Sequence, residues 1–189
     1  MADTLLALNK KLNKLNFIDF SNLLNKYASA NGLKISNIIN KSSFNNKIYS
    51  GRARKIRNFT VNINTNIITI YADKSGSGKY ELLKFEENDN FRRQYIKLYL
   101  ENLTEKQLEK IDSYSGNILK KTLQIEIPDY DKYQVVKKVV KEWENLQQEI
   151  EDLEEKIEET DSEIDQMVYE LYDLDDDEIE IVEGGKIHG

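Results

Sequence analysis

The last third of the chain carries an unusually long heptad pattern. From Val139 to Leu171 the apolar positions recur at alternating steps of four and three residues, with Thr160 as the one polar member. This spacing is typical of a long helix that packs along one face. At a rise of about 1.5 Å per residue, a helix from Asp131 to Tyr172 would be roughly 60 Å long. The seam residues are Val139, Trp143, Leu146, Ile150, Leu153, Ile157, Thr160, Ile164, Met167 and Leu171.

Acidic residues flank most of this seam, so two parallel copies of the helix would bring like charges face to face. A homodimer through the acidic seam is therefore disfavoured. The N-terminal segment, residues 1–31, predicts one or two amphipathic helices and offers a better partner, because it is basic and has the same spacing. We expect the first and last helices to pair in antiparallel orientation. The N-terminal stripe is Leu5, Leu8, Leu12 and Leu15, with Lys10, Lys11 and Lys14 beside it.

The middle of the chain, residues 32–128, mixes strand and helix patterns. "FTVNINTNIITIYAD" predicts a hairpin that turns at residues 64–66, and "KYELLKF" predicts a third strand. Helical spacing from Phe91 to Tyr99 is followed by Thr104 and Gln107, the pattern of a capping box. "TLQIEI" alternates as a strand that Pro128 would end.

These patterns predict an α+β fold, with a small mixed or antiparallel sheet and helices, plus a long coiled-coil-like C-terminal helix packed against an N-terminal helix. The expected organisation has four parts: bracing helices at 1–31, the α+β domain at 32–128, the heptad helix at 129–172 and an acidic tail at 173–189.

The formal charge of −7 conceals a strong asymmetry. Residues 1–141 hold 25 Lys and Arg against 14 Asp and Glu, whereas residues 142–189 hold 2 against 20. A basic body of this kind favours a polyanionic partner.

The sequence contains few residues that could support metal binding, acid-base catalysis or nucleotide binding. There is no cysteine, and the one histidine is His188, so metal ligation and acid-base catalysis by these residues are disfavoured. The glycine-rich "DKSGSGK" lacks Walker spacing, since Asp73 and Tyr80 stand where Gly and Ser or Thr would be needed. We identify no active site, no metal site, no signal peptide and no membrane span, and we expect a cytoplasmic location.

The segment "KIYSGRARKIRNF" is the strongest candidate for a binding site. Arginine forks suit phosphates and guanine edges, and Gly51 permits close approach of a backbone. The alternative is an ordinary solvated loop. A basic DNA-binding face is favoured by further residues of the same kind. The glycine loop contains two lysines and two serines, and two arginines stand at 92 and 93. The predicted DNA-contacting residues are Lys47, Arg52, Arg54, Lys55, Arg57, Lys74, Ser75, Ser77, Lys79, Arg92 and Arg93.

The C-terminal stretch "ETDSEIDQMVYELYDLDDDEIEIVEG" resembles the end of the large type IIG restriction-modification enzymes, in which "ID-x-x-VY-x-LYGL" precedes an acidic "EEI-x-IVE". Asp173 stands where glycine is usual. Similar endings occur in type I specificity subunits and in related phage-defence methylases. "YSGRARKIRNF" with the strands that follow is similar to the target-recognition portion of such enzymes. The matching C-terminal residues are Ile164, Asp165, Val168, Tyr169, Leu171, Tyr172, Leu174, Glu178, Ile179, Ile181, Val182 and Glu183.

This resemblance implies a non-catalytic module that recognises a sequence in double-stranded DNA and directs adenine methylation or cleavage. Endonuclease and methyltransferase motifs are absent from the chain, so the catalytic region would be another part or another chain. S-adenosylmethionine and Mg²⁺ would belong to that region, and no cofactor is expected here. Two alternatives remain: a protein-interaction adaptor that uses the acidic heptad helix, and a small enzyme with an unrecognised site.

Overall fold

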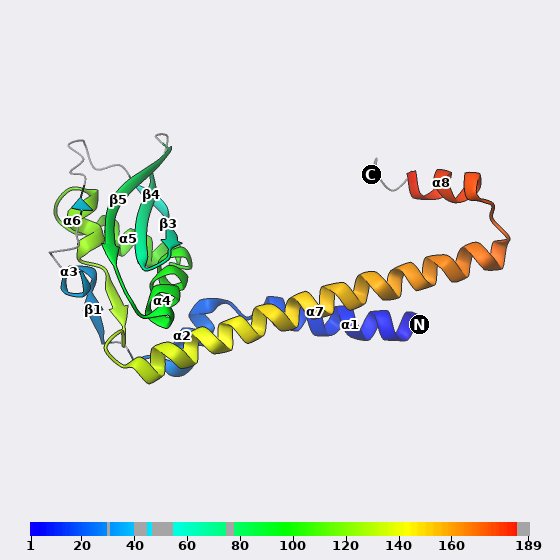
Figure 1. The fold of residues 1–189 in the computed structure, drawn as a ribbon, viewed down its shortest axis with the longest axis horizontal. Coiled ribbons are helices and arrows are strands. Elements are labelled where there is room, and N and C mark those ends of the chain that lie inside the picture. The colour runs from blue at the N-terminus through cyan, green and yellow to red at the C-terminus, as the bar shows by residue number, and fades with distance from the viewer. Residues whose placement is uncertain (30, 40–44, 47–54, 75–77, 185–189) are drawn as a thin grey trace. The chain divides into compact units, whose positions relative to one another are not determined.

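A computed structural model of the protein describes residues 1–29, 31–39, 45–46, 55–74 and 78–184, and gives only the backbone of residues 45, 46 and 74. These residues form two units (Figure 1). Unit 1 combines residues 1–18 with 145–189, and unit 2 consists of residues 19–144. In chain order the elements are α1 (Ala2–Asn16), α2 (Phe20–Tyr27), β1 (Gly32–Lys34), α3 (Ile35–Ile38), β2 (Asn45–Asn46), β3 (Ile56–Asn64), β4 (Ile67–Lys74), β5 (Gly78–Glu86), α4 (Asn90–Glu101), α5 (Glu105–Asp112), α6 (Ile118–Leu123), β6 (Glu126–Pro128), α7 (Tyr133–Tyr172) and α8 (Asp176–Gly184).

The larger sheet lies in unit 2 and is antiparallel, with the strand order β2-β5-β4-β3. A tight turn at Thr65 and Asn66 joins β3 to β4, and Thr65 has a φ of 56°. This confirms the predicted hairpin, and β5 confirms the predicted third strand. The α+β fold class is likewise confirmed, with antiparallel sheets and a long C-terminal helix.

The core of unit 2 lies between this sheet and the helices. Helix α4 packs on β3, and the side chain of Tyr95 in α4 is fully buried. Its hydroxyl donates a 2.9 Å hydrogen bond to the carbonyl of Pro128, which ties α4 to β6. Burial, together with the nearby Asp129 carboxylate, raises the pKa of Tyr95. The neutral phenol is therefore the form that the core holds.

A second, two-stranded sheet pairs β1 with β6. Gly32 faces Pro128 in this pair, and a Cβ atom at Gly32 would lie only 2.8 Å from the carbonyl oxygen of Ile127. The two backbones approach too closely for any other residue, so this position requires glycine.

Asp129 follows β6 and ties it to the end of α2. Its buried carboxylate accepts hydrogen bonds of 2.6 Å from both the backbone amide and the hydroxyl of Ser29, and one of 2.8 Å from the ammonium of Lys132. Burial alone would raise the pKa of Asp129, but the hydrogen bonds from Lys132 and Ser29 outweigh it and lower the pKa to about 2. The ionised carboxylate is therefore part of the folded state.

Strand β3 forms one edge of the larger sheet, and carboxylates cover two of its backbone amides. Glu101, at the end of α4, accepts a 2.8 Å hydrogen bond from the amide of Val61. Asp112, at the end of α5, accepts one of 3.1 Å from the amide of Ile56. These contacts protect the edge from pairing with another strand.

In unit 1, α1 runs beside α7 in the opposite direction (Figure 1). The ammonium of Lys11 lies 2.8 Å from the carboxylate of Glu149, whereas Met1 and Ala2 lie next to Ile164. The leucine stripe of α1 is half-buried, and Leu153 on α7 is buried. The predicted antiparallel pairing of the N-terminal helix with the long helix is therefore confirmed.

One segment differs from the sequence prediction. "TLQIEI" does not form one strand, because Thr122 and Leu123 end α6 and only residues 126–128 are extended. The helix is favoured locally because the side chain of Asn117 caps its start, accepting a hydrogen bond from the backbone amide of Lys120. The acidic segment 173–189 contains α8, which Asp175 and Glu178 cap reciprocally.

The two units cut across the segments of the chain. The first 18 residues join the second half of α7, while α2 joins the α+β core. Within the described residues, no helix combines the length and apolar character needed to cross a membrane.

Candidate nucleic-acid interface

Several of the predicted DNA-contacting residues meet at one end of the larger sheet. Strand β3 begins there, β4 ends there and β5 begins there. Ile56 pairs with Lys74, Lys74 with Gly78, and Asp73 with Lys79. This register brings four basic residues to the same end of three neighbouring strands. They are Lys55, Arg57, Lys74 and Lys79, and we call this set the basic end.

Arg57 occupies a β-bulge. The register of β3 with β4 passes from Ile56 opposite Lys74 directly to Asn58 opposite Asp73, so Arg57 is the extra residue. Its side chain is exposed. Because a bulge bends the strand and re-aims the inserted side chain, the backbone presents this guanidinium at the sheet edge, out of register with the ladder.

The start of β3 is fastened to the helices behind it. The amide of Ile56 donates to the carboxylate of Asp112, which also lies 3.8 Å from the ammonium of Lys121. Lys121 is only 7% exposed, and its ammonium donates to the backbone carbonyl of Asp112 as well. This group of polar contacts fixes the backbone between Lys55 and Arg57, so the two side chains project from a rigid base.

Lys79 extends the basic end onto β5. Its ammonium lies 5.4 Å from the centre of the Tyr71 ring, a cation–π arrangement, and its backbone is paired with that of Asp73. The aromatic face holds the ammonium without neutralising its charge. Tyr71 was not among the predicted site residues.

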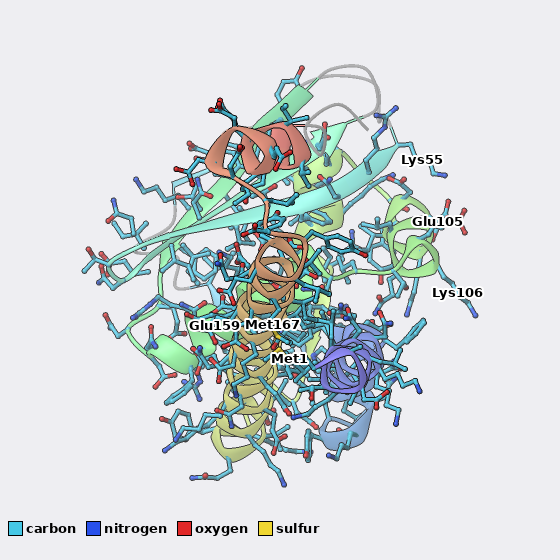
Figure 2. The ribbon with its side chains drawn as sticks, turned by 90° about the vertical axis from the view of Figure 1, so that its right-hand side faces the viewer. Met1, Lys55, Glu105, Lys106, Glu159 and Met167 are labelled. Carbon is cyan, nitrogen blue, oxygen red and sulfur yellow. The ribbon has the colours of Figure 1, made fainter. Side chains whose placement is uncertain are left out.

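Acidic residues of α5 border the basic end. Lys55 projects from the start of β3, and Glu105 and Lys106 project from α5 (Figure 2). The ammonium of Lys55 lies 3.9 Å from the carboxylate of Glu109, but both side chains are more than half exposed, so the pair is weak. An open groove of about 540 Å³ lies beside these contacts; its lining is Lys55, Ile56, Arg57, Leu103, Glu105 and Leu108.

Arg92 and Arg93 are placed apart from the basic end. They lie in the first turn of α4, which follows the opposite end of β5, where Glu86 pairs with Ile67. Arg93 donates 2.7 Å and 2.8 Å hydrogen bonds to the carbonyls of Glu87 and Asn88. The guanidinium of Arg92 lies 5.2 Å from the centre of the Tyr130 ring. Both arginines therefore brace the connection between β5 and α4.

The remaining predicted contacts fall outside the described side chains. Lys74 is placed by its backbone alone. Lys47, Arg52, Arg54, Ser75 and Ser77 lie outside the described residues.

The basic end can bind an anion, and its chemistry is that of phosphate contact. The exposed side chains of Lys55 and Arg57 from β3 and of Lys79 from β5 supply charge and hydrogen-bond donors. In the described ranges, no three acidic or histidine side chains come close enough to hold a metal ion.

Comparison with known proteins adds no relative: the chain matches no protein-family model, no curated protein and no solved structure.

Proposed function

We propose that this protein is a DNA-recognition module, and that the basic end of the larger sheet contacts double-stranded DNA. The observation that carries this proposal is the placement of Lys55 and Arg57 on β3 and of Lys79 on β5 at the same end of the sheet, with β4 between the two strands. The sequence of Arg52 and Arg54, directly before Lys55, adds cations to the same stretch of chain.

Each side chain has a distinct expected role. The fork of Arg57 suits bidentate contact with a phosphate or a guanine edge, and the bulge fixes the backbone that presents it. Lys55 and Lys79 act as point charges toward phosphates.

The division of charge between the two units supports the same function. Unit 2 has 22 Lys and Arg against 15 Asp and Glu, a formal charge of +7, whereas unit 1 has 5 against 19, a charge of −14. A polyanion is therefore attracted to unit 2 and repelled by unit 1, which limits the surface on which DNA can bind.

The wider role that we propose is a specificity module of a restriction-modification system in the cytoplasm. The resemblance of residues 159–184 to type IIG enzymes supports it. In this role the chain binds the target sequence, and a methyltransferase or endonuclease region modifies or cleaves the DNA. S-adenosylmethionine and Mg²⁺ act in that catalytic region.

The test is a titration of labelled duplex DNA with the full chain at two salt concentrations. We expect weak binding whose affinity falls at least about tenfold between roughly 50 and 200 mM salt, because bound phosphates release counterions. Arg57→Ala should weaken binding by about 1 to 3 kcal/mol. Lys141→Ala is the matched control, since Lys141 is an exposed cation of unit 2 on α7. Equal affinity of wild type and Arg57→Ala, or binding that ignores salt, would refute the proposed interface.

A further inference from the structure

The seam of α7 continues beyond the helix that covers it. Helix α1 covers the seam only as far as Met1 and Ala2. These two residues border an open apolar groove of about 400 Å³. The floor of the groove on α7 is formed by two seam residues that follow Ile164, namely Met167 and Leu171, and by Val168. Met167 and Met1 are labelled in Figure 2.

These side chains are exposed to an unusual degree for large apolar residues. Met167 is 53% exposed and Leu171 is 77% exposed. They lie one helical turn apart, so they present one continuous apolar strip. Within the described part of unit 1 the seam is thus covered near Leu153 and open near Leu171.

Helix α1 shows what kind of helix this seam accepts. Its leucines at steps of three and four lie half-buried on α7, and its Lys11 pairs at 2.8 Å with Glu149 on the flank of the seam. The contact therefore combines an apolar stripe with a basic flank. Both properties are needed, because an apolar helix with acidic flanks would face the carboxylates of α7.

The charge around the open groove is more one-sided than around the covered seam. Residues 157–184 contain 13 Asp and Glu and no Lys or Arg. Three of these carboxylates, Glu163, Glu170 and Asp173, lie within two residues of a groove residue in the sequence. A second copy of this helix would bring the same negative charges onto the groove, whereas a basic helix would neutralise them.

We propose that the groove formed by Met1, Ala2, Ile164, Met167, Val168 and Leu171 binds a basic amphipathic helix of a partner protein. The occupant presents apolar residues at steps of three and four to Met167 and Leu171, and Lys or Arg to the flanking carboxylates. It continues along α7 the contact that α1 makes. This inference does not rest on DNA binding, which involves unit 2, so either proposal can fail without the other.

The experiment measures binding of a labelled peptide to the full chain. The probe is "ADTLLALNKKLNKLNF", the sequence of residues 2–17, because it has the apolar stripe and basic flank that the groove calls for. We expect saturable binding at peptide concentrations of up to about 1 mM. Met167→Ser combined with Leu171→Ser should weaken it at least about tenfold, since two large apolar contacts are lost.

Two controls make the result specific. Phe17→Ser in the full chain removes an equally large apolar side chain, 82% exposed at the other end of α1, and should leave the affinity unchanged. A peptide with Lys10→Glu, Lys11→Glu and Lys14→Glu should bind at least about tenfold more weakly. Thermal melting of each chain variant checks that it folds, and folding is expected because the changed side chains are exposed.

Four results would overturn the proposal. The first is that the peptide does not bind. The second is that it binds equally well to the Met167→Ser, Leu171→Ser variant, which would mean that it binds by charge alone or by displacing α1. The third is that the glutamate peptide binds as tightly as the original peptide, which would show that the groove does not require a basic helix. Sedimentation that shows a dimer of the wild type and a monomer of the Met167 and Leu171 variant would identify a second copy as the occupant.

Discussion

The backbone amide of Ile56 donates a 3.1 Å hydrogen bond to the carboxylate of Asp112, which closes the start of an edge strand against the end of a helix. Ile56 stands between Lys55 and Arg57 in the sequence. The backbone geometry of the basic end therefore depends on the acidic residue Asp112. Lys121 completes the arrangement from α6, with its ammonium 3.8 Å from the same carboxylate.

Asp112→Ala should destabilise unit 2 by about 2 to 4 kcal/mol, because it leaves the amide of Ile56 and the buried ammonium of Lys121 without the carboxylate. Urea unfolding measures the loss. Glu109→Ala is the matched control: it removes an exposed ion pair from the same helix and should cost less than about 1 kcal/mol.

A second substitution separates buried charge from lost packing. Adding Lys121→Met to Asp112→Ala should recover part of the lost stability, because the unpaired charge disappears. If the double variant is as unstable as the sum of the two single variants, the pair does not act as a unit.

Arg93→Ala should lower stability by about 1 to 2 kcal/mol and leave duplex affinity unchanged. Its guanidinium holds the carbonyls of Glu87 and Asn88 rather than facing the basic end. Denaturation and the duplex titration on the same preparation check both parts. A variant of normal stability that loses DNA affinity would instead show that the interface reaches the first turn of α4.

Acid should destabilise the protein through Asp129. The pKa of this carboxyl falls from an ordinary value of 3.8 when unfolded to about 2 when folded, so its contribution is present above pH 3.8 and is lost as the pH falls through about 2. The shift corresponds to about 2 kcal/mol. Urea midpoints between pH 5 and pH 2 measure it. Asp129→Asn should be less stable at pH 5 and show a smaller fall toward pH 2; a fall as steep as that of the wild type would assign the acid sensitivity to other carboxyls.

Leu12→Asp should loosen unit 1 without disturbing unit 2. Leu12 lies half-buried on the stripe of α1, and the new carboxylate would face the acidic flank of α7. We expect lower thermal stability, measured by circular dichroism. Trp143, the only tryptophan, packs edge-on against Phe20 at 5.5 Å in unit 2, so its fluorescence should stay constant below the main transition. A shifted tryptophan spectrum in the native state would show that the two units are coupled.

Local sequence patterns predicted the structural features that depend on residues close together in the chain. The capping box of Thr104 and Gln107 starts α5 as expected, with both reciprocal hydrogen bonds present. The hairpin turn also lies where alternation breaks, at Thr65 and Asn66. The heptad spacing likewise predicted the long helix, because each step depends on neighbours within seven residues.

The sequence could not predict the contacts that join distant segments. Nothing near Asp112 indicates that its carboxylate binds the amide of Ile56, since 56 residues separate them. The bulge at Arg57 depends on the register with β4, which the residues of β3 alone do not define. Arg93 looks like any exposed cation until the β5–α4 connection folds around it. Of the candidate site, only the cations of β3, β4 and β5 could be anticipated as one group.

The pairing of Lys11 with Glu149 also sets an order of events during synthesis. Proteins emerge from the ribosome N-terminus first, and domains generally fold as units. Unit 2 uses residues 19–144 alone and can fold while the rest of the chain is still being made. Unit 1 has to wait, because α1 is made before residues 19–144 and its partner on α7 after them. Until then the leucine stripe of α1 lacks the partner that half-buries it in the folded protein.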